Sequence, residues 1–137
     1  MKKKNKNKII FTYANGNKIY QKNGKYHRED GPAIEYPNGT KSWYLEGNRS
    51  RIDGPAIEYA NGTKSWYLEG ELHRVDGPAI EYYSGFKYWY LKGKFHREDG
   101  PAIIYSDGYK EWWLNGNRIL CSSQKEFEQL LRLKAFW

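Results

Sequence analysis

The sequence predicts a mainly β protein: a single antiparallel sheet of β-hairpin repeats, a solenoid-like meander of about ten strands, with a short C-terminal helix. Three observations predict this class. The segment Asp-Gly-Pro-Ala-Ile recurs every 23 residues, starting at Asp30, Asp53, Asp76 and Asp99. Aromatic residues are abundant, with six Trp, thirteen Tyr and five Phe. Most of the fourteen Gly residues stand in Asn-Gly or Asp-Gly pairs, which mark turns between strands.

The repeat sets the organisation of the chain. The five copies span residues 7–29, 30–52, 53–75, 76–98 and 99–121. The first copy is atypical, as a terminal repeat often is: it carries Tyr20 where the later copies carry Trp43, Trp66, Trp89 and Trp112. We interpret residues 1–6 as a basic, disordered tail and residues 122–137 as a capping helix.

Within one copy, the turn predicts the pairing of the strands. Two strand-forming runs flank Asn38-Gly39, a pair that favours a two-residue type I′ turn. This register places Ile34 opposite Trp43. Alternation then sorts the side chains into an apolar core face and a mixed outer face. The core face would carry Pro32, Ile34, Tyr36, Lys41, Trp43 and Leu45, and the outer face Ala33, Glu35, Ser42, Tyr44 and Glu46. The four repeated Trp residues are therefore expected in the core.

The C-terminus changes character. Ser123 and Glu126 have the spacing of a capping box and precede an apolar run containing Phe127, Leu130 and Leu131. We expect a helix over about residues 123–135. Its simplest role is to cover the last open strand edge, which would otherwise invite aggregation.

The repeated motifs resemble a known class of repeats. The 23-residue period, the Trp-Tyr-Leu-x-Gly segment, the His-Arg-x-Asp-Gly-Pro-Ala segment and the Asn-Gly turn together resemble MORN-type β-hairpin repeats over residues 7–121. The resemblance is closest to a bacterial and phage variety of such repeats. It implies a scaffold that contacts other proteins, sometimes with association to membrane phospholipids, and implies no enzymatic activity.

Charge and cysteine content narrow the function classes. The net charge is +7, but Lys2, Lys3, Lys4, Lys6 and Lys8 supply five of the 23 basic residues, so the remainder carries only +2. The chain has one cysteine, Cys121, which suits a reducing compartment. No apolar stretch approaches the length of a membrane span, and no signal peptide is recognisable. We therefore expect a cytoplasmic protein.

The His-Arg-x-Asp segment supplies the most conspicuous polar residues. His27, His73 and His96 occupy one repeated position, and Ser50 replaces histidine in one copy. Equivalent residues in successive copies lie too far apart to share a metal ion, so we expect no metal, no cofactor and no catalytic residues. Instead of forming such a site, each Asp can order its own turn and pair with an Arg of the same or a neighbouring copy. A second possibility is that the repeated row of Arg28, Arg51, Arg74 and Arg97 binds an acidic partner.

An aromatic row is the other candidate site. Tyr44, Tyr67, Tyr90 and Trp113 lie on the predicted outer face, and Tyr88 enlarges the row. Exposed aromatic patches often mark interfaces. The competing interpretation is that these rings pack on one another as cladding of the sheet.

These features favour a non-catalytic module that binds a partner protein through its repeat surface, and not an enzyme. Two alternatives stay open. One is a phage or mobile-element inhibitor of a host defence nuclease. The other is binding of nucleic acid or anionic lipid through the basic tail. An open edge at the N-terminal strand also leaves homodimerisation possible.

Overall fold

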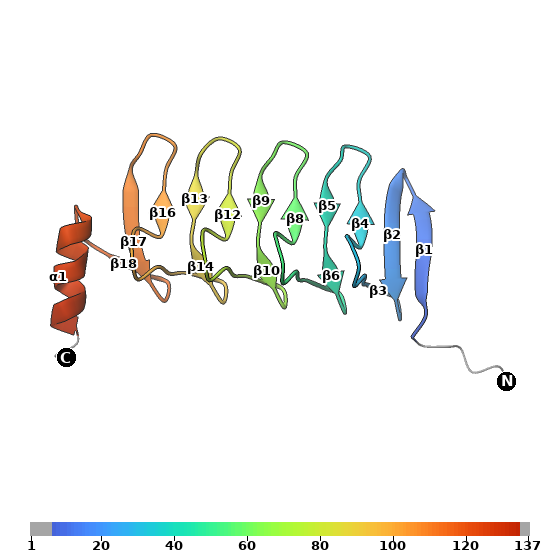
Figure 1. Cartoon of the computed structure of the whole chain (residues 1–137), viewed down its shortest axis with the longest axis horizontal. Helices are drawn as coiled ribbons and strands as arrows, with labels where there is room; N and C mark the ends of the chain where they lie inside the picture. The colour runs from blue at the N-terminus through green and yellow to red at the C-terminus, as the bar shows by residue number, and fades with distance from the viewer. Residues whose placement is uncertain (1–6, 135–137) are drawn as a thin grey trace. The chain divides into compact units, whose positions relative to one another are not determined.

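The structure, a computed structural model, describes residues 7–134 (Figure 1). The described residues form eighteen short strands and one helix, α1 (Gln124–Lys134). The strands are β1 (Ile9–Ala14), β2 (Asn17–Lys22), β3 (Lys25–Tyr26), β4 (Ile34–Glu35), β5 (Lys41–Ser42), β6 (Tyr44–Leu45), β7 (Asn48–Arg49), β8 (Ile57–Glu58), β9 (Lys64–Ser65), β10 (Tyr67–Leu68), β11 (Glu71–Leu72), β12 (Ile80–Glu81), β13 (Lys87–Tyr88), β14 (Tyr90–Leu91), β15 (Lys94–Phe95), β16 (Ile103–Ile104), β17 (Lys110–Leu114) and β18 (Asn117–Ile119). The predicted basic tail, residues 1–6, lies outside the described residues, as do residues 135–137.

Two compact units divide the chain between Glu71 and Leu72. In the first unit the strands lie in the order β1-β2-β4-β5-β8-β9, with β3 also beside β2. In the second unit the order is β12-β13-β16-β17-β18. Within each unit the second strand of one copy pairs antiparallel with the first strand of the next, as β5 does with β8 and β13 with β16. The predicted class, mainly β with antiparallel hairpins in chain order and one short C-terminal helix, is confirmed.

The prediction of a two-residue type I′ turn is correct only for the first copy. There Asn15 and Gly16 both have positive φ, and Phe11 lies opposite Tyr20. In the second copy only Gly39 has positive φ, and the N–H of Gly39 donates to the carbonyl of Tyr36. The connection is therefore a three-residue loop, a type I turn followed by a left-handed glycine.

Because the loop has one residue more than predicted, the predicted strand register is wrong by one residue. Ile34 lies opposite Ser42 and not opposite Trp43, and Glu35 lies opposite Lys41. The oxygen of the Asn38 side chain accepts the N–H of Thr40 at 2.9 Å, a local bond that holds the three-residue loop. The same pairing recurs in the fourth copy, where Ile80 lies opposite Tyr88.

A second, tighter turn closes the other end of each copy. Glu46 and Gly47 both have positive φ and join β6 to β7 as a two-residue turn, with Leu45 opposite Asn48. The N–H of Gly47 also donates to the carbonyl of Tyr26 in the preceding copy at 2.9 Å. Successive copies are therefore joined at both ends of the hairpin.

The register correction changes which side chains form the core. Ala33 and Ala56 are fully buried, and Ser42, which was expected on the outer face, is only 3% exposed. Of the four repeated Trp residues, Trp112 alone is buried, while Trp43, Trp66 and Trp89 are half-buried. The reason is that Ser42 takes the place opposite Ile34, and the chain leaves the strand at residue 43. The core of the repeated hairpins is thus built mainly of small residues and isoleucines, with no continuous row of Trp, and large side chains join it only at the last hairpin.

The C-terminal helix agrees with the capping motif. The N–H of Glu126 donates to the Oγ of Ser123 at 3.2 Å, and the Glu126 carboxylate accepts the N–H of Ser122. Phe127 is fully buried and packs in one cluster with Trp112 and Leu114 of β17. The helix therefore packs against the last hairpin of the second unit. Within residues 7–134, no helix has the length and apolar character required to cross a membrane.

Candidate functional site

Each repeated arginine is held by its own loop. The Nε of Arg28 donates to Asp30 Oδ1 at 3.0 Å, and its Nη1 donates to the carbonyl of Pro32 at 3.1 Å. The guanidinium carbon lies 4.0 Å from the centre of the Tyr20 ring, within the range of a cation–π contact. On the other side stands Gly31, where an added Cβ would lie 2.9 Å from that carbon. The guanidinium is thus enclosed between an aromatic ring and a glycine.

The same arrangement recurs in the later copies. Arg51 and Arg97 stack on Trp43 and Trp89, with the guanidinium carbon 3.9 and 4.1 Å from the ring centres. The Arg–Asp distances at Arg51, Arg74 and Arg97 are 3.1, 3.0 and 2.9 Å. The arginine side chains are only 21–23% exposed. The alternative in which Asp orders the turn and pairs with Arg therefore describes the observed contacts, and it explains why a Trp or Tyr is half-buried in each of the first four copies.

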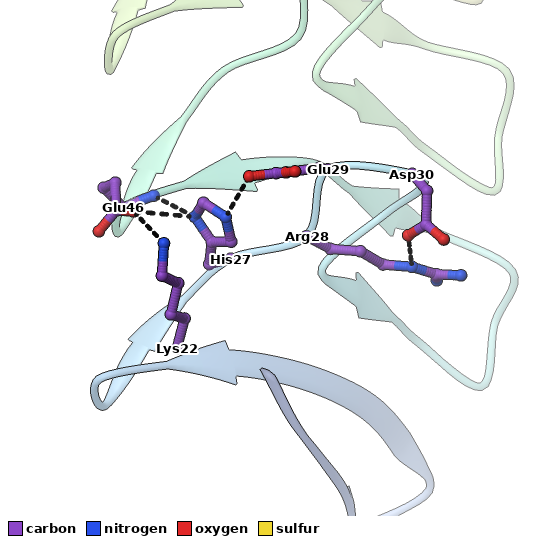
Figure 2. A network of polar contacts seen from close by, with 6 residues as sticks. All are labelled: Lys22, His27, Arg28, Glu29, Asp30 and Glu46. Carbon is purple, nitrogen blue, oxygen red and sulfur yellow. Dashed lines mark hydrogen bonds and ion pairs between the residues drawn. The ribbon is translucent and has the colours of Figure 1, made fainter. Parts of the chain in front are cut away.

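Histidine has an equally repeated role. The Nδ1 of His27 accepts the N–H of Glu46 at 2.9 Å, and that of His96 accepts the N–H of Asn115 at 2.9 Å. Figure 2 shows His27 between Glu46 and Glu29, with the Nε2 lying 3.5 Å from the Glu29 carboxylate. Because Nδ1 is an acceptor, it carries no proton in this arrangement, and the neutral ring holds its proton on Nε2.

Nε2 of His27 is buried and makes no hydrogen bond of good geometry. At 3.5 Å from the carboxylate of the exposed Glu29, this nitrogen is too far away for a tight hydrogen bond. Lys22 donates to Glu46 at 3.2 Å, and this hydrogen bond lowers the pKa of the Glu46 carboxyl. The network ties the tight turn of one copy to the His-Arg segment that precedes it.

The copy without histidine shows what the position requires. The Oγ of Ser50 accepts the N–H of Glu69 at 3.2 Å, which is the bond that His27 makes with Glu46. A hydroxyl and an imidazole share little chemistry beyond hydrogen bonding. The repeated position therefore selects for an acceptor of a turn N–H.

The aromatic row is packed within itself. Tyr26 lies 5.2 Å from Tyr44 between ring centres, and Arg49 lies over both Tyr44 and Tyr67 at 5.8 and 5.6 Å. In the second unit Phe95 stacks on Tyr90 at 4.3 Å and also contacts two further members of the row, Trp113 at 5.2 Å and Tyr88 at 5.8 Å. All five predicted row residues are half-buried. These contacts match the cladding interpretation, and the structure brings the row together within each unit.

Each unit also contains an open cleft beside the Arg–Asp loops. In the first unit a cleft of about 620 Å³ lies between the loops of Arg28 and Arg51, with Trp43 and Leu45 in its lining. In the second unit a cleft of about 650 Å³ lies between the loops of Arg74 and Arg97, with Trp89 and Leu91 in equivalent places. Each cleft thus combines a Trp-Leu wall with charged Arg–Asp pairs at its rim.

Two aliphatic residues at these clefts were not among the site residues predicted from the sequence. Ile52 is 89% exposed in the first cleft, and Val75 is 83% exposed in the second. They occupy the variable position of His-Arg-x-Asp, where two other copies carry Glu29 and Glu98. The signal was present in the sequence, because two copies carry an apolar residue in this otherwise polar loop.

Other candidate chemistry is sparse in the described chain. Over residues 7–134, no group of three or more His, Cys, Asp or Glu side chains is placed to hold a metal ion. Burial, followed by the charge of Glu126, raises the pKa of the Cys121 thiol, which lies beside the buried cluster of the last hairpin. A raised pKa lowers the fraction of reactive thiolate. No protein-family model matches the chain, and no curated protein matches it in sequence.

Proposed function

We propose that this chain is a non-catalytic protein-interaction module that binds a partner protein at the clefts beside its Arg–Asp loops. The observation that carries the proposal is the exposure of Ile52 and Val75 at the rims of these clefts. An aliphatic side chain left almost wholly in water contributes nothing to folding, whereas its burial by a partner is worth roughly 1.5–3 kcal/mol.

The polar residues support a structural role and not catalysis. Arginine, aspartate and histidine make the same contacts in successive copies, and Ser50 replaces histidine without loss of the hydrogen bond. A catalytic site needs one asymmetric constellation of nucleophile, base and charge stabiliser. A surface repeated with small variations is instead suited to binding, where the variable positions select the partner.

The cleft indicates the kind of segment that a partner would present. Trp89 and Leu91 offer an apolar wall, while Arg74 and Asp76 place both charges at the rim. A partner loop with an aliphatic or aromatic anchor flanked by polar residues would match this combination. The aromatic row and the arginine row, Tyr44, Tyr67, Tyr90, Trp113, Tyr88, Arg28, Arg51, Arg74 and Arg97, then act chiefly as the framework around the clefts.

The repeat itself supplies variants that should fold. Glu occurs naturally at the positions equivalent to Ile52 and Val75, so Ile52→Glu and Val75→Glu should leave the fold intact. The experiment is photo-crosslinking in cells from a reactive residue placed at position 75, with a second variant labelled at Ser84 as the control. Ser84 is also exposed and lies in the loop between β12 and β13, away from the lining of the second cleft.

A partner captured from position 75, absent from the Ser84 control and no longer bound by a Val75→Glu variant, is the expected result. Equal capture from both labelled positions would contradict the use of the cleft. A catalytic activity that survived Ile52→Glu but disappeared on a conservative change at one polar residue would contradict a non-catalytic role altogether.

A further inference from the structure

β1 differs from the other strands of its unit. It is six residues long, whereas most strands of the later copies have two, and it pairs with β2 alone among the described residues. Its sequence is Ile-Ile-Phe-Thr-Tyr-Ala, and all six residues are exposed. Figure 1 shows β1 beside β2 as the last strand of the sheet in the first unit. β1 therefore presents an edge together with apolar side chains on both faces.

The register identifies which backbone groups point away from β2. A two-residue turn closes on a hydrogen-bonded pair, here Ala14 with Asn17, and the bonded pairs alternate from there. The pair Phe11–Tyr20 is consequently a non-bonded one. This agrees with the N–H and carbonyl of Tyr20 bonding on the opposite side of β2, to Ala33 and His27. The N–H and C=O groups of Ile9, Phe11 and Tyr13 thus face outward from the edge.

Edge strands usually carry features that discourage pairing, such as an inward charge, a proline, a bulge or a covering element. The segment Ile9–Ala14 has no charged residue and no proline, and its six pairs with β2 run without interruption. The helix α1 gives the last hairpin of the second unit such a cover, through the burial of Phe127. β1 is thus suited to accept an additional strand.

The charge around β1 indicates what kind of strand it would accept. Residues 7–28 contain five of the 23 basic residues of the chain and none of its 16 acidic residues. Lys22 and Arg28 are paired with Glu46 and Asp30. Lys8 and Lys18, in contrast, form no ion pair within residues 7–134. Lys18 lies opposite Tyr13 of β1 on one side and opposite Glu35 of β4 on the other. Positive charge thus flanks the open edge at both ends, and Glu35 is the acidic neighbour of Lys18 on the side away from that edge.

We propose that β1 binds an extended acidic segment of a partner protein, which adds to the sheet as a further strand. Backbone hydrogen bonds to Ile9, Phe11 and Tyr13 would supply affinity, and carboxylates on the added strand would select it through Lys8 and Lys18. This surface is separate from the clefts of Ile52 and Val75, so the inference goes beyond the proposed function and does not depend on it.

Two other occupants fit the surface less well. A second copy of the chain would bring a second β1 with the same basic surroundings, and like charges placed side by side oppose association. A nucleic acid would match the charge but would leave the outward N–H groups of the strand and the aliphatic side chains of Ile9 and Ile10 without matching partners. A β-strand with acidic side chains satisfies the backbone, the apolar surface and the charge together.

The test uses the full chain, labelled with ¹⁵N, and a synthetic peptide that alternates valine and glutamate over the length of β1. Peptides with glutamine or lysine in place of glutamate serve as charge controls. We expect the glutamate peptide to shift the amide signals of residues 9–14, to slow hydrogen exchange at Ile9, Phe11 and Tyr13, and to bind more weakly as salt is raised. Equal binding of the lysine peptide would overturn the proposal.

A matched pair of variants separates the backbone from the side chain. Phe11→Ala removes the ring but keeps the outward N–H, whereas Phe11→Pro removes both without deleting a bond to β2. We expect Phe11→Pro to bind the glutamate peptide at least about tenfold more weakly than Phe11→Ala, because a ladder hydrogen bond is lost and the ring of proline obstructs pairing. Equal affinities of the two variants would overturn the backbone pairing.

A double variant at two lysines keeps the proposal testable if Phe11→Pro unfolds the hairpin. Lys8→Gln with Lys18→Gln leaves β1 itself unchanged and should weaken binding of the glutamate peptide but not of the glutamine peptide. Sedimentation of the unliganded chain and titration with a single-stranded oligonucleotide complete the experiment. A dimer that Phe11→Pro abolishes, or an oligonucleotide that shifts the same amides more strongly than the peptide, would overturn the proposal in favour of that occupant.

Discussion

Ser50 and Glu69 are joined by a hydrogen bond in which the Glu69 N–H donates to the Ser50 Oγ at 3.2 Å. One copy earlier, Glu46 donates in the same way to the Nδ1 of His27 at 2.9 Å. Both donors belong to the first residue of a tight turn, where the residue has positive φ. The acceptor therefore stabilises a backbone conformation that an L-residue adopts reluctantly.

The first prediction concerns this acceptor. Ser50→Ala leaves the N–H of Glu69 without its partner at a site where Ser50 is only 6% exposed. We expect a loss of about 1–3 kcal/mol in the free energy of unfolding, measured by urea denaturation. Ser50→His should be tolerated, because the chain uses histidine at the equivalent positions. A Ser50→Ala variant as stable as the wild type would show that water replaces the acceptor.

The second prediction concerns the glycine that lies against each repeated arginine. At Gly100 an added Cβ would lie 2.6 Å from the guanidinium carbon of Arg97, and φ at this glycine is not in the left-handed region. Gly100→Ala should therefore displace the Arg97 guanidinium from its position between Trp89 and Gly100 and destabilise the chain by about 1–3 kcal/mol. In an Arg97→Ala background the same substitution should cost much less. A double-mutant cycle measured by denaturation checks this coupling, and additive effects would contradict it.

The period of the sequence was enough to predict the hairpin class, and the capping-box spacing of Ser123 and Glu126 predicted the helix. The register of the later copies was not predictable from the Asn-Gly pair alone. That pair accommodates a two-residue turn at Asn15-Gly16 and a three-residue loop at Asn38-Gly39. The two geometries differ by one residue, and in a strand one residue exchanges the faces. This single ambiguity moved Ser42 into the core and left Trp43 half-buried.

The framework of the candidate site was less predictable than the fold. The pairing of Arg with Asp was expected, but the stacking of Arg51 on Trp43 was not, because it depends on Trp43 lying outside the core. Tyr44 was placed correctly in an aromatic row, whose rings turn out to contact one another. Exposure of Ile52 could have been inferred from its departure from Glu29 in an otherwise regular motif. Contacts between copies require the register, so they follow only from three-dimensional structure.

The third prediction concerns the helix that covers the last hairpin. Phe127 is fully buried and lies 6.4 Å from Trp112 between ring centres. Phe127→Ala should leave a cavity and cost about 3–5 kcal/mol, with loss of helical signal before the rest of the chain unfolds. Leu133→Ala on the same helix removes a side chain that is 57% exposed and should change stability little. Hydrogen exchange of α1 in both variants distinguishes local release of the helix from global unfolding.

The fourth prediction concerns the pH dependence of the helix start. Hydrogen bonds from the backbone N–H and then the hydroxyl of Ser122 lower the pKa of the Glu126 carboxyl. A carboxyl whose pKa is lower in the folded state stabilises that state when ionised. Its contribution is therefore complete above the ordinary pKa of about 4.3 and is lost as the pH falls through the lower, folded value.

Glu126→Gln removes this ionisation, so the stability difference between wild type and variant should be largest at neutral pH and should shrink in acid. Denaturation curves recorded from pH 7 down to about pH 3 measure it, over a range that brackets the ordinary carboxyl pKa. Glu128→Gln makes the same change of charge on the same helix without contacting Ser122, and it controls for the net charge. A stability difference for Glu126→Gln that stayed constant through acid would mean that the carboxylate does not hold the helix start, and that Ser123 alone caps it.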